Sequence, residues 1–479
     1  MHGDDHVHPS HWLHGPRLWA LSAAVGAALG VIWAFLMPGV VDLSGKAVIP
    51  LVLVVPFIAL LASIAVCPLV SARWWHRHYP DVALFLGGLV GAYYVVAFRT
   101  ARGPETTLHT AIEYTAFIAL IGGLYVASGG VLVKLEKPVG PAANTLFLLL
   151  GAVLANFVGT TGASMLLIRP FMRANEGRLK PLHVVFFIFI VSNCGGLLTP
   201  IGDPPLYLGF VKGVPFFWTA RWLGPSWLLT VGVLLVMFFV YDTLAARRLA
   251  RESGEPTPIS GILPRAKIIA RPLTILLLVA IVGSVFIDPL LSRVIDLHHV
   301  PVGAIVQIIL AIAAFFTARK DIREANDFSF EPVKEVGLLF AGIFLTMMPA
   351  LGYLATNGGK LGVDSPTAFY FATGTLSAVL DNAPTYLNFL QVALAPAEVG
   401  RDAIHALIAT PEGRLTLEAV STGAVFFGAM TYIGNGPNFM VRAIAERAEV
   451  KMPSFFAYAG MACLILLPVL VLHWLVIIR

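Results

Sequence analysis

The 479-residue sequence contains little charge: only 12% of its residues are Asp, Glu, Lys or Arg, whereas 58% are hydrophobic. A soluble protein needs roughly a quarter of its residues charged to cover its surface with polar groups. This shortage excludes an ordinary soluble enzyme and indicates a chain covered mostly by lipid. The repeated apolar stretches have the length of membrane-spanning helices, whereas β-barrel strands are short and alternating.

Cysteine is also scarce, and the three cysteines lie in or beside apolar segments: Cys67, Cys194 and Cys463. This pattern excludes a disulfide framework and a thiolate metal site. The sequence has no His-Glu-x-x-His pair for zinc and no Gly-x-Gly-Asp motif of an intramembrane aspartyl protease. We therefore predict that the protein is not an enzyme and has no cofactor. The net charge of +5 comes from short loops and does not indicate nucleic-acid binding.

The first 16 residues are rich in histidine, with His2, His6, His8, His11 and His14. We interpret residues 1–16 as a cytoplasmic tail, with weak metal binding or pH sensing as the alternative to simple disorder. The apolar run that follows is too long for the core of a signal peptide. Residues 17–47 are therefore predicted to be a retained first span and its loop.

The apolar windows predict an all-α polytopic membrane protein with about 11 transmembrane helices. The predicted spans are 17–37, 48–66, 82–98, 109–133, 182–212, 222–242, 271–290, 301–317, 336–353, 418–441 and 455–478. Two further apolar stretches, 142–172 and 366–394, carry Gly, Asn, Thr or Pro near their middle. We predict that both are re-entrant hairpins.

The distribution of basic residues predicts the orientation. With both hairpins re-entrant, the basic loops fall on one side together with the N-terminus: 73–77, 173–180, the linker 243–270 and 319–334. The positive-inside rule then places the N-terminus in the cytoplasm and the C-terminus outside, in a bacterial-type inner membrane.

Two distant segments match each other. Residues 196–205 read GLLTPIGDPP and residues 428–437 read GAMTYIGNGP, an offset of 232. Each lies in an interrupted helix that follows a hairpin, so we predict two five-helix repeats, 48–242 and 271–479. Because each repeat has an odd number of spans, the second copy is expected to be inverted, as in many alternating-access transporters.

The interrupted helices and the hairpins carry two carboxylates, Asp203 and Asp381. A charge at the centre of a bilayer costs at least ~2.5–3.5 kcal/mol, so each is a candidate for function. Burial favours the neutral carboxyl, so a proton and a cation would compete for the same oxygens. The alternative is that each aspartate caps its half-helix, an interpretation that fits Asp203 before Pro204 well.

Neutral oxygen donors surround these carboxylates in the sequence, and hard oxygen ligands suit Na⁺ or Li⁺. The alternative is that such side chains join helices together. The candidate ligands are Asn156, Thr160, Thr161, Ser192, Asn193, Thr199, Asn382, Thr385, Thr431, Asn435 and Asn438. Other charges in apolar segments, Glu113, His183 and Asp242, are expected at the membrane interface. Arg169 is expected to mark a cytoplasmic rim, with an anion contact as the alternative.

At these motifs the chain resembles the ion transporter superfamily, and most of all NhaD-type sodium/proton antiporters. The resemblance lies in SNCGGLLTPIGDP at 192–204, DNAP at 381–384 and MTYIGNGPNFMV at 430–441. It implies a homodimer in which a transport domain, holding both hairpins and both broken helices, moves against a scaffold domain. The superfamily also includes citrate, arsenite and dicarboxylate carriers, although the Ser-Asn-Thr signatures of dicarboxylate carriers are absent here.

The sequence thus predicts a secondary transporter that exchanges Na⁺ or Li⁺ for protons across the bilayer. No Arg or Lys lies within the four motif cores to bind an anion. The alternative is a Na⁺- or H⁺-coupled transporter of citrate-type carboxylates, with the anion held by half-helix N-termini and hydroxyl groups.

Overall fold

The computed structural model describes residues 15–479 except 42–46, 100–101, 136–139, 254–265 and 292–299. The histidines of the N-terminal tail lie outside the described residues. Nine helices in the described part of the chain are long and apolar enough to cross a membrane. Two predicted spans form apolar helices that are shorter, α8 (Pro272–Ser284) and α10 (Val302–Thr317). The chain is an all-α polytopic membrane protein.

The chain divides into two compact units, which we describe separately. The first comprises Met1–Tyr114 and Lys334–Tyr353. Its elements are α1 (Pro16–Leu36), β1 (Val40–Val41), β2 (Ala47–Val48), η1 (Leu51–Val54), α2 (Val55–Ala97), the first part of α3 (Gly103–Ser128) and most of α12 (Glu331–Asn357).

Within the first unit, α1 packs on the second half of α2 through small residues. A Cβ added at Gly26 or Gly30 would overlap the backbone carbonyls of Phe85 and Leu89. Glycines four residues apart allow two helix backbones to approach closely. Such close packing stabilises helix pairs in lipid, where the hydrophobic effect does not drive helices together.

The loop predicted between spans 48–66 and 82–98 is helical instead. α2 runs through it with a single non-helical residue, Ser71 at φ −152° and ψ 85°. The break follows Pro68, and it separates two candidate spans, Leu51–Ser71 and Arg73–Ala97. Proline removes a backbone donor and disturbs the preceding turn, which accounts for a kink rather than an open loop.

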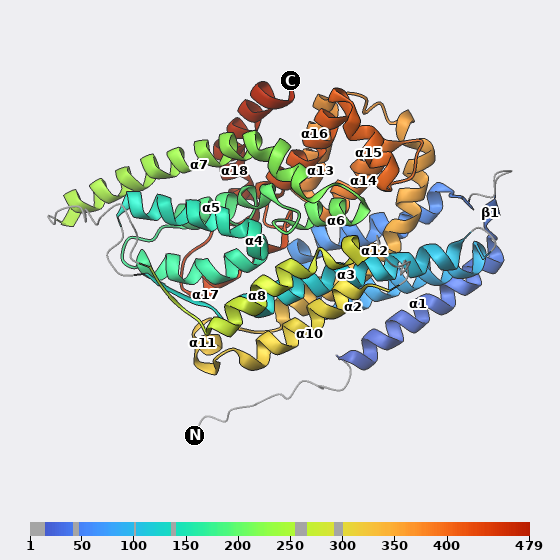
Figure 1. Cartoon of the computed structure of the whole chain (residues 1–479), viewed down its shortest axis with the longest axis horizontal. Helices are drawn as coiled ribbons and strands as arrows, with labels where there is room; N and C mark the ends of the chain where they lie inside the picture. The colour runs from blue at the N-terminus through green and yellow to red at the C-terminus, as the bar shows by residue number, and fades with distance from the viewer. Residues whose placement is uncertain (1–14, 42–46, 100–101, 136–139, 254–265, 292–299) are drawn as a thin grey trace. The chain divides into compact units, whose positions relative to one another are not determined.

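The second unit, Thr115–Val333 and Leu354–Arg479, contains both hairpins and both broken helices. Its first half contains the rest of α3, β3 (Leu132–Leu135), α4 (Pro141–Ala174), α5 (Pro181–Ile190), η2 (Cys194–Leu198), α6 (Pro204–Lys212), α7 (Phe216–Ser253) and β4 (Ala266–Ile269), which pairs antiparallel with β3. Then follow α8, α9 (Ile287–Leu291), α10, α11 (Lys320–Ala325), η3 (Gly358–Lys360), α13 (Pro366–Val379), α14 (Asn382–Leu394), α15 (Arg401–Ala409), α16 (Pro411–Phe427), η4 (Gly428–Met430), α17 (Gly436–Arg447), α18 (Phe455–His473) and the π-helical η5 (Trp474–Ile478). Figure 1 shows α4, α5 and α7 lying side by side.

The stretch predicted as the first hairpin folds back on itself. α4 turns at Gly159, whose φ of +77° lies in the region that favours glycine. Its two ends meet, because the Nδ2 of Asn144 lies 2.6 Å from the Oδ1 of Asn175. In the second stretch, α13 and α14 pack against each other on either side of an extended break at Leu380 and Asp381.

The two broken helices follow the positions of glycine and proline. α5 ends at Ile190, a short 3₁₀ turn follows, and α6 begins at Pro204. In the second half, α16 ends at Phe427 and α17 begins with Gly436 and Pro437. Proline is well tolerated in the first turn of a helix, where its missing N–H is not needed, so it restarts the helix after each break.

Candidate functional site

Each hairpin tip binds the neighbouring broken helix in the same way. The backbone N–H of Thr160 donates to the carbonyl of Gly202 at 2.8 Å, and that of Asn382 donates to Gly434 at 3.1 Å. Backbone groups freed by the breaks are therefore paired with the tips, as the membrane interior requires.

A second contact also recurs in both halves. The hydroxyl of Thr199 donates to the carbonyl of Asn156, and that of Thr431 donates to Ala378, both at 2.6 Å. Thr199 and Thr431 are separated by the offset of 232 that relates the two motifs. The two halves share these local contacts, while the inverted orientation of the repeats stays a prediction.

Asp203 lies where all four elements meet, and only 1% of its surface is exposed. Its Oδ1 accepts hydrogen bonds from the hydroxyl of Thr160 at 2.7 Å and from the Nδ2 of Asn435 at 3.0 Å. Its Oδ2 accepts from the Nδ2 of Asn382 at 2.6 Å. We call Thr160, Asp203, Asn382 and Asn435 the Asp203 cage.

A second layer of amides holds the cage in place. The Nδ2 of Asn435 also lies 3.1 Å from the Oδ1 of Asn193, and the Nδ2 of Asn193 donates to the Oδ1 of Asn438 at 2.7 Å. Asn438 in turn donates to the carbonyls of Gly428 and Thr431. Ser192 exchanges a hydrogen bond with Ser164 on α4 at 2.7 Å. The chain of contacts links the two broken helices across the centre of the site.

The two aspartates have different contacts, and the capping interpretation fits Asp381 and not Asp203. Asp203 precedes α6, yet its side chain makes no capping hydrogen bond. The half-buried Asp381 does cap α14, because its Oδ1 accepts from the N–H of Ala383 at 3.0 Å. Pro205, the second residue of α6, has no N–H to donate to a capping side chain, which leaves the carboxylate of Asp203 free to point into the cage.

The remaining candidate residues serve the backbone around the site. Asn156 donates to the carbonyl of Gly195 and accepts from the N–H of Leu198, which ties the hairpin to η2. Thr385 donates to the carbonyl of Asp381. Thr161 lines a small cavity beside Asp203. Among the described residues, no hydrogen bond joins Asn156, Thr199, Thr385 or Thr431 to the carboxylate of Asp203.

The cage has unoccupied acceptor oxygens and a small adjoining cavity. An ionised carboxylate offers about four acceptor sites, of which three are occupied here. Within the described part of the chain the Oδ1 of Asn382 has no hydrogen-bond partner, although the side chain is fully buried. The adjoining cavity, lined by Gly159, Thr160, Gly202 and Asp203 among others, measures about 20 Å³. That volume suffices for one water molecule or a small ion.

A comparison with protein families found a match over most of the chain. A family model described as "Putative citrate transport" matches residues 46–478. The chain belongs to this family. Membership supports a transport role and the broader resemblance to the ion transporter superfamily, whereas the specific resemblance to NhaD-type antiporters stays a prediction. No curated protein matches the chain.

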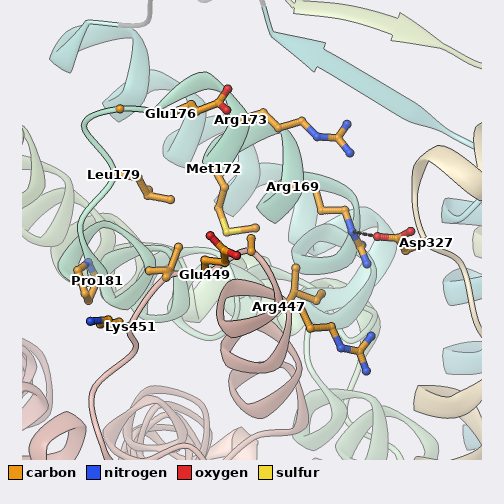
Figure 2. A pocket seen from close by; sticks show the side chains of 14 residues that line it. Arg169, Met172, Arg173, Glu176, Leu179, Pro181, Asp327, Arg447, Glu449 and Lys451 are labelled. Carbon is orange, nitrogen blue, oxygen red and sulfur yellow. Dashed lines mark ion pairs between the residues drawn. The ribbon is translucent and has the colours of Figure 1, made fainter. Parts of the chain in front are cut away.

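The described part of this transporter contains a much larger pocket of about 520 Å³ away from the cage (Figure 2). It lies between the end of α4, the loop to α5 and the end of α17. Arg169, expected at a rim, lines this pocket and lies 3.4 Å from Asp327. The cytoplasmic rim and the contact with an anion both stay predictions.

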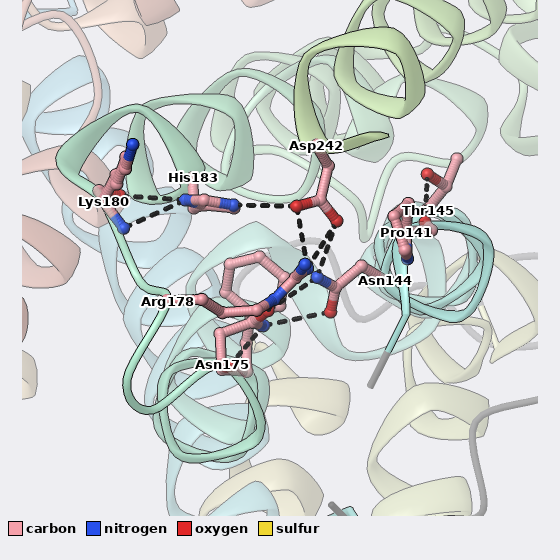
Figure 3. Close-up of polar contacts among 9 residues, drawn as sticks. Pro141, Asn144, Thr145, Asn175, Arg178, Lys180, His183 and Asp242 are labelled. Atoms are coloured by element: carbon pink, nitrogen blue, oxygen red, sulfur yellow. Dashed lines mark hydrogen bonds and ion pairs between the residues drawn. The ribbon is translucent and has the colours of Figure 1, made fainter. Parts of the chain in front are cut away.

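A buried ionic cluster joins the two ends of α4 to α5 and α7 (Figure 3). The carboxylate of Asp242 contacts the guanidinium of Arg178 at 2.7 Å and the Nε2 of His183 at 3.0 Å. It also accepts from the Nδ2 of Asn144, which is bonded to Asn175. Asp242 is fully buried and His183 is 1% exposed, so neither is a solvated surface charge, and their position at the membrane interface stays a prediction.

The predicted end of the span 222–242 is wrong, because hydropathy falls after residue 242 while the helix does not end there. α7 continues to Ser253, so the first part of the predicted linker 243–270 is helical. A signal in the sequence supports this extension: Arg248 and Glu252, four residues apart, form an ion pair along the helix.

Proposed function

We propose that the protein is a cation-coupled secondary transporter in which Na⁺ or Li⁺ binds at Asp203 in competition with a proton. The observation that carries this proposal is the Asp203 cage, where one buried carboxylate on the first broken helix receives a contact from each hairpin and from the second broken helix. A group shared by four separate elements changes its surroundings whenever any of these elements moves. Ion occupancy and conformation are thereby coupled.

The ligand chemistry of the cage suits a hard monovalent cation. The available oxygens are the carboxylate of Asp203, the hydroxyl of Thr160 and the unpartnered Oδ1 of Asn382. Rotation of the Asn435 amide by half a turn would present its oxygen in place of its nitrogen, since the two ends have the same shape. Loss of the proton from Asp203 supplies the negative charge that binds the cation.

The cargo that we propose is a carboxylate of the citrate class, because the family match points to citrate transport. This takes precedence over the exchange of Na⁺ for protons that the sequence alone favours. Cation/proton exchange is the second candidate, and one observation supports it: among the described residues, no Lys, Arg or His contacts the carboxylate of Asp203. A carboxylate with no basic side chain beside it can bind a proton and Na⁺ in turn.

Reconstituted proteoliposomes separate the two candidates. Uptake of radiolabelled citrate driven by an inward Na⁺ or proton gradient supports the carboxylate transporter, and Asp203→Asn should abolish the coupled uptake. If a fluorescent probe inside the vesicles reports a rise in internal pH after external addition of Na⁺ or Li⁺, and citrate is not taken up, the protein exchanges cations for protons instead. Full coupled activity in Asp203→Asn would contradict both candidates.

A further inference from the structure

The 520 Å³ pocket lies at the far ends of two helices that begin at the Asp203 cage. The second half of α4 runs from Thr160 in the cage to Arg173 at the pocket, a length of about 20 Å at 1.5 Å per residue. α17 begins directly after Asn435 and ends at Arg447, about 18 Å away. The two helices pack against each other. The pocket and the Asp203 cage therefore lie at opposite ends of the same two packed helices.

The lining of this pocket carries four basic and three acidic side chains, so it has a small excess of positive charge. The side chains of Arg173, Arg447 and Lys451 make no hydrogen bond or ion pair with any other described residue. Figure 2 shows the guanidinium groups of Arg169, Arg173 and Arg447 along one side of the pocket, with the carboxylates of Glu176 and Glu449 to their left. Of these three arginines, Arg169 alone has a carboxylate partner within the described part of the chain, Asp327.

The backbone of the lining is also unusual. Asp327 and Glu449 have positive φ values of 44° and 61°, and Gly177 has 85°. Residues other than glycine, here Asp327 and Glu449, cost free energy in this region, and such residues are enriched at binding sites.

We propose that this pocket, which we call the cationic vestibule, binds a small organic polycarboxylate on its way to or from the Asp203 cage. The inference deepens the proposed function and rests on it. Guanidinium and ammonium groups pair strongly with carboxylates, and a volume of 520 Å³ lies in the range of small-molecule sites. Arg447 and Lys451 attract the anion, while Glu449 opposes it and keeps binding weak enough for release. The basic loop 173–180 at its edge is one that the sequence predicts to be cytoplasmic.

Equilibrium binding of citrate to the purified full-length protein, in nanodiscs of zwitterionic lipid, tests the proposal. Arg447→Gln and Lys451→Gln should each weaken binding by about three- to tenfold, since each removes one charge near the surface. Glu449→Gln should strengthen binding by a similar factor. Arg319→Gln, which removes an exposed arginine paired with Asp321 outside the pocket, is the matched control and should leave binding unchanged. A purely structural role would not produce effects of opposite sign.

Citrate affinity that is the same in wild type, Arg447→Gln, Lys451→Gln and Glu449→Gln would overturn the proposal. So would equal displacement of citrate by inorganic phosphate, or loss of citrate binding when anionic lipid is added to the nanodiscs, because these results assign the vestibule to simple anions or to lipid headgroups. Citrate uptake into proteoliposomes is measured in parallel. Binding with the expected charge dependence but without uptake would support the vestibule and refute the proposed function; uptake with charge-independent binding would refute the vestibule alone.

Discussion

At the scale of single residues, two aspartates in similar contexts have different physical roles. The carboxylate of Asp203 is fully buried and accepts three hydrogen bonds from side chains on other elements. These donors offset the cost of removing a carboxylate from water. Asp381 uses its carboxylate on the N–H of Ala383, within its own helix. Its role is local, and replacing it with a residue that cannot cap should destabilise α14.

Asp381 therefore supplies the first prediction. Asparagine is as good a cap as aspartate, so Asp381→Asn should retain both stability and coupled transport, whereas Asp381→Ala should lose about 1 kcal/mol of stability. Thermal unfolding of the purified variants measures the difference. Loss of transport in Asp381→Asn with unchanged unfolding would show that the charge itself acts in the ion site.

The sequence does not predict which aspartate lies in the cage and which one caps its helix. Both motifs place an aspartate just before a half-helix, and an aspartate before a proline fits a cap. The outcome depends on where Thr160, Asn382 and Asn435 lie in space, and these residues are up to 275 positions apart in the sequence. The list of candidate ligands contained all members of the cage, but it also contained residues that bond only to the backbone.

At the scale of elements, each broken helix depends on two glycines in close approach. A Cβ at Gly202 would overlap the carbonyl of Gly196, and one at Gly434 would lie 2.6 Å from the carbonyl oxygen of Gly428. The matched segments 196–205 and 428–437 reveal these positions from the sequence, because both pairs recur at the same offset. The close contact explains why the recurring residues are glycines.

Gly202→Ala should consequently destabilise the protein by about 1–3 kcal/mol and disrupt the cage, because the neighbouring backbone must shift. Gly232→Ala is the control: it lies within α7 with no heavy atom near the added methyl group, and it should be neutral or slightly stabilising. Thermal unfolding in detergent compares the two variants. Equal stability of Gly202→Ala and wild type would show that the break can relax around a side chain.

The cluster at Asp242 is also a property of elements, because it holds both ends of α4 against α5 and α7. Asp242→Ala leaves the buried Arg178 and His183 without their carboxylate, a change that typically costs about 3–5 kcal/mol. We expect a large fall in the unfolding temperature. Glu252→Ala, which removes an exposed carboxylate from the same helix, should leave it unchanged. Similar unfolding of both variants would contradict a structural role for the cluster.

At the scale of the whole molecule, hydropathy predicted the class of fold because membrane helices must be apolar over their full length. It placed helix ends less well, as in the continuous α2 and the extended α7, since polar residues outside the bilayer continue a helix without any hydropathy signal. Nine helices in the described residues qualify as spans by length and composition. Eight of them are among the eleven predicted spans, and the ninth is α4, which forms the first hairpin. The three predicted spans that do not qualify are α8, α10 and the broken helix at 418–441.

Orientation in the membrane is a prediction at this scale. With Cys67, Cys194 and Cys463 replaced by serine, single cysteines at Arg251 and Arg479 report the two sides. We expect an impermeant maleimide to label Arg251→Cys only in inside-out vesicles and Arg479→Cys only in right-side-out vesicles. Labelling of both from the same side would refute the predicted topology.

The central claim is that the coupling ion binds at Asp203. The most direct measurement is the binding of radioactive sodium to the purified protein. The account predicts saturable binding to wild type and to Asp381→Asn that weakens as the pH falls, because protons compete for the same carboxylate oxygens, and no binding to Asp203→Asn. Sodium binding to Asp203→Asn with the affinity of wild type would contradict it.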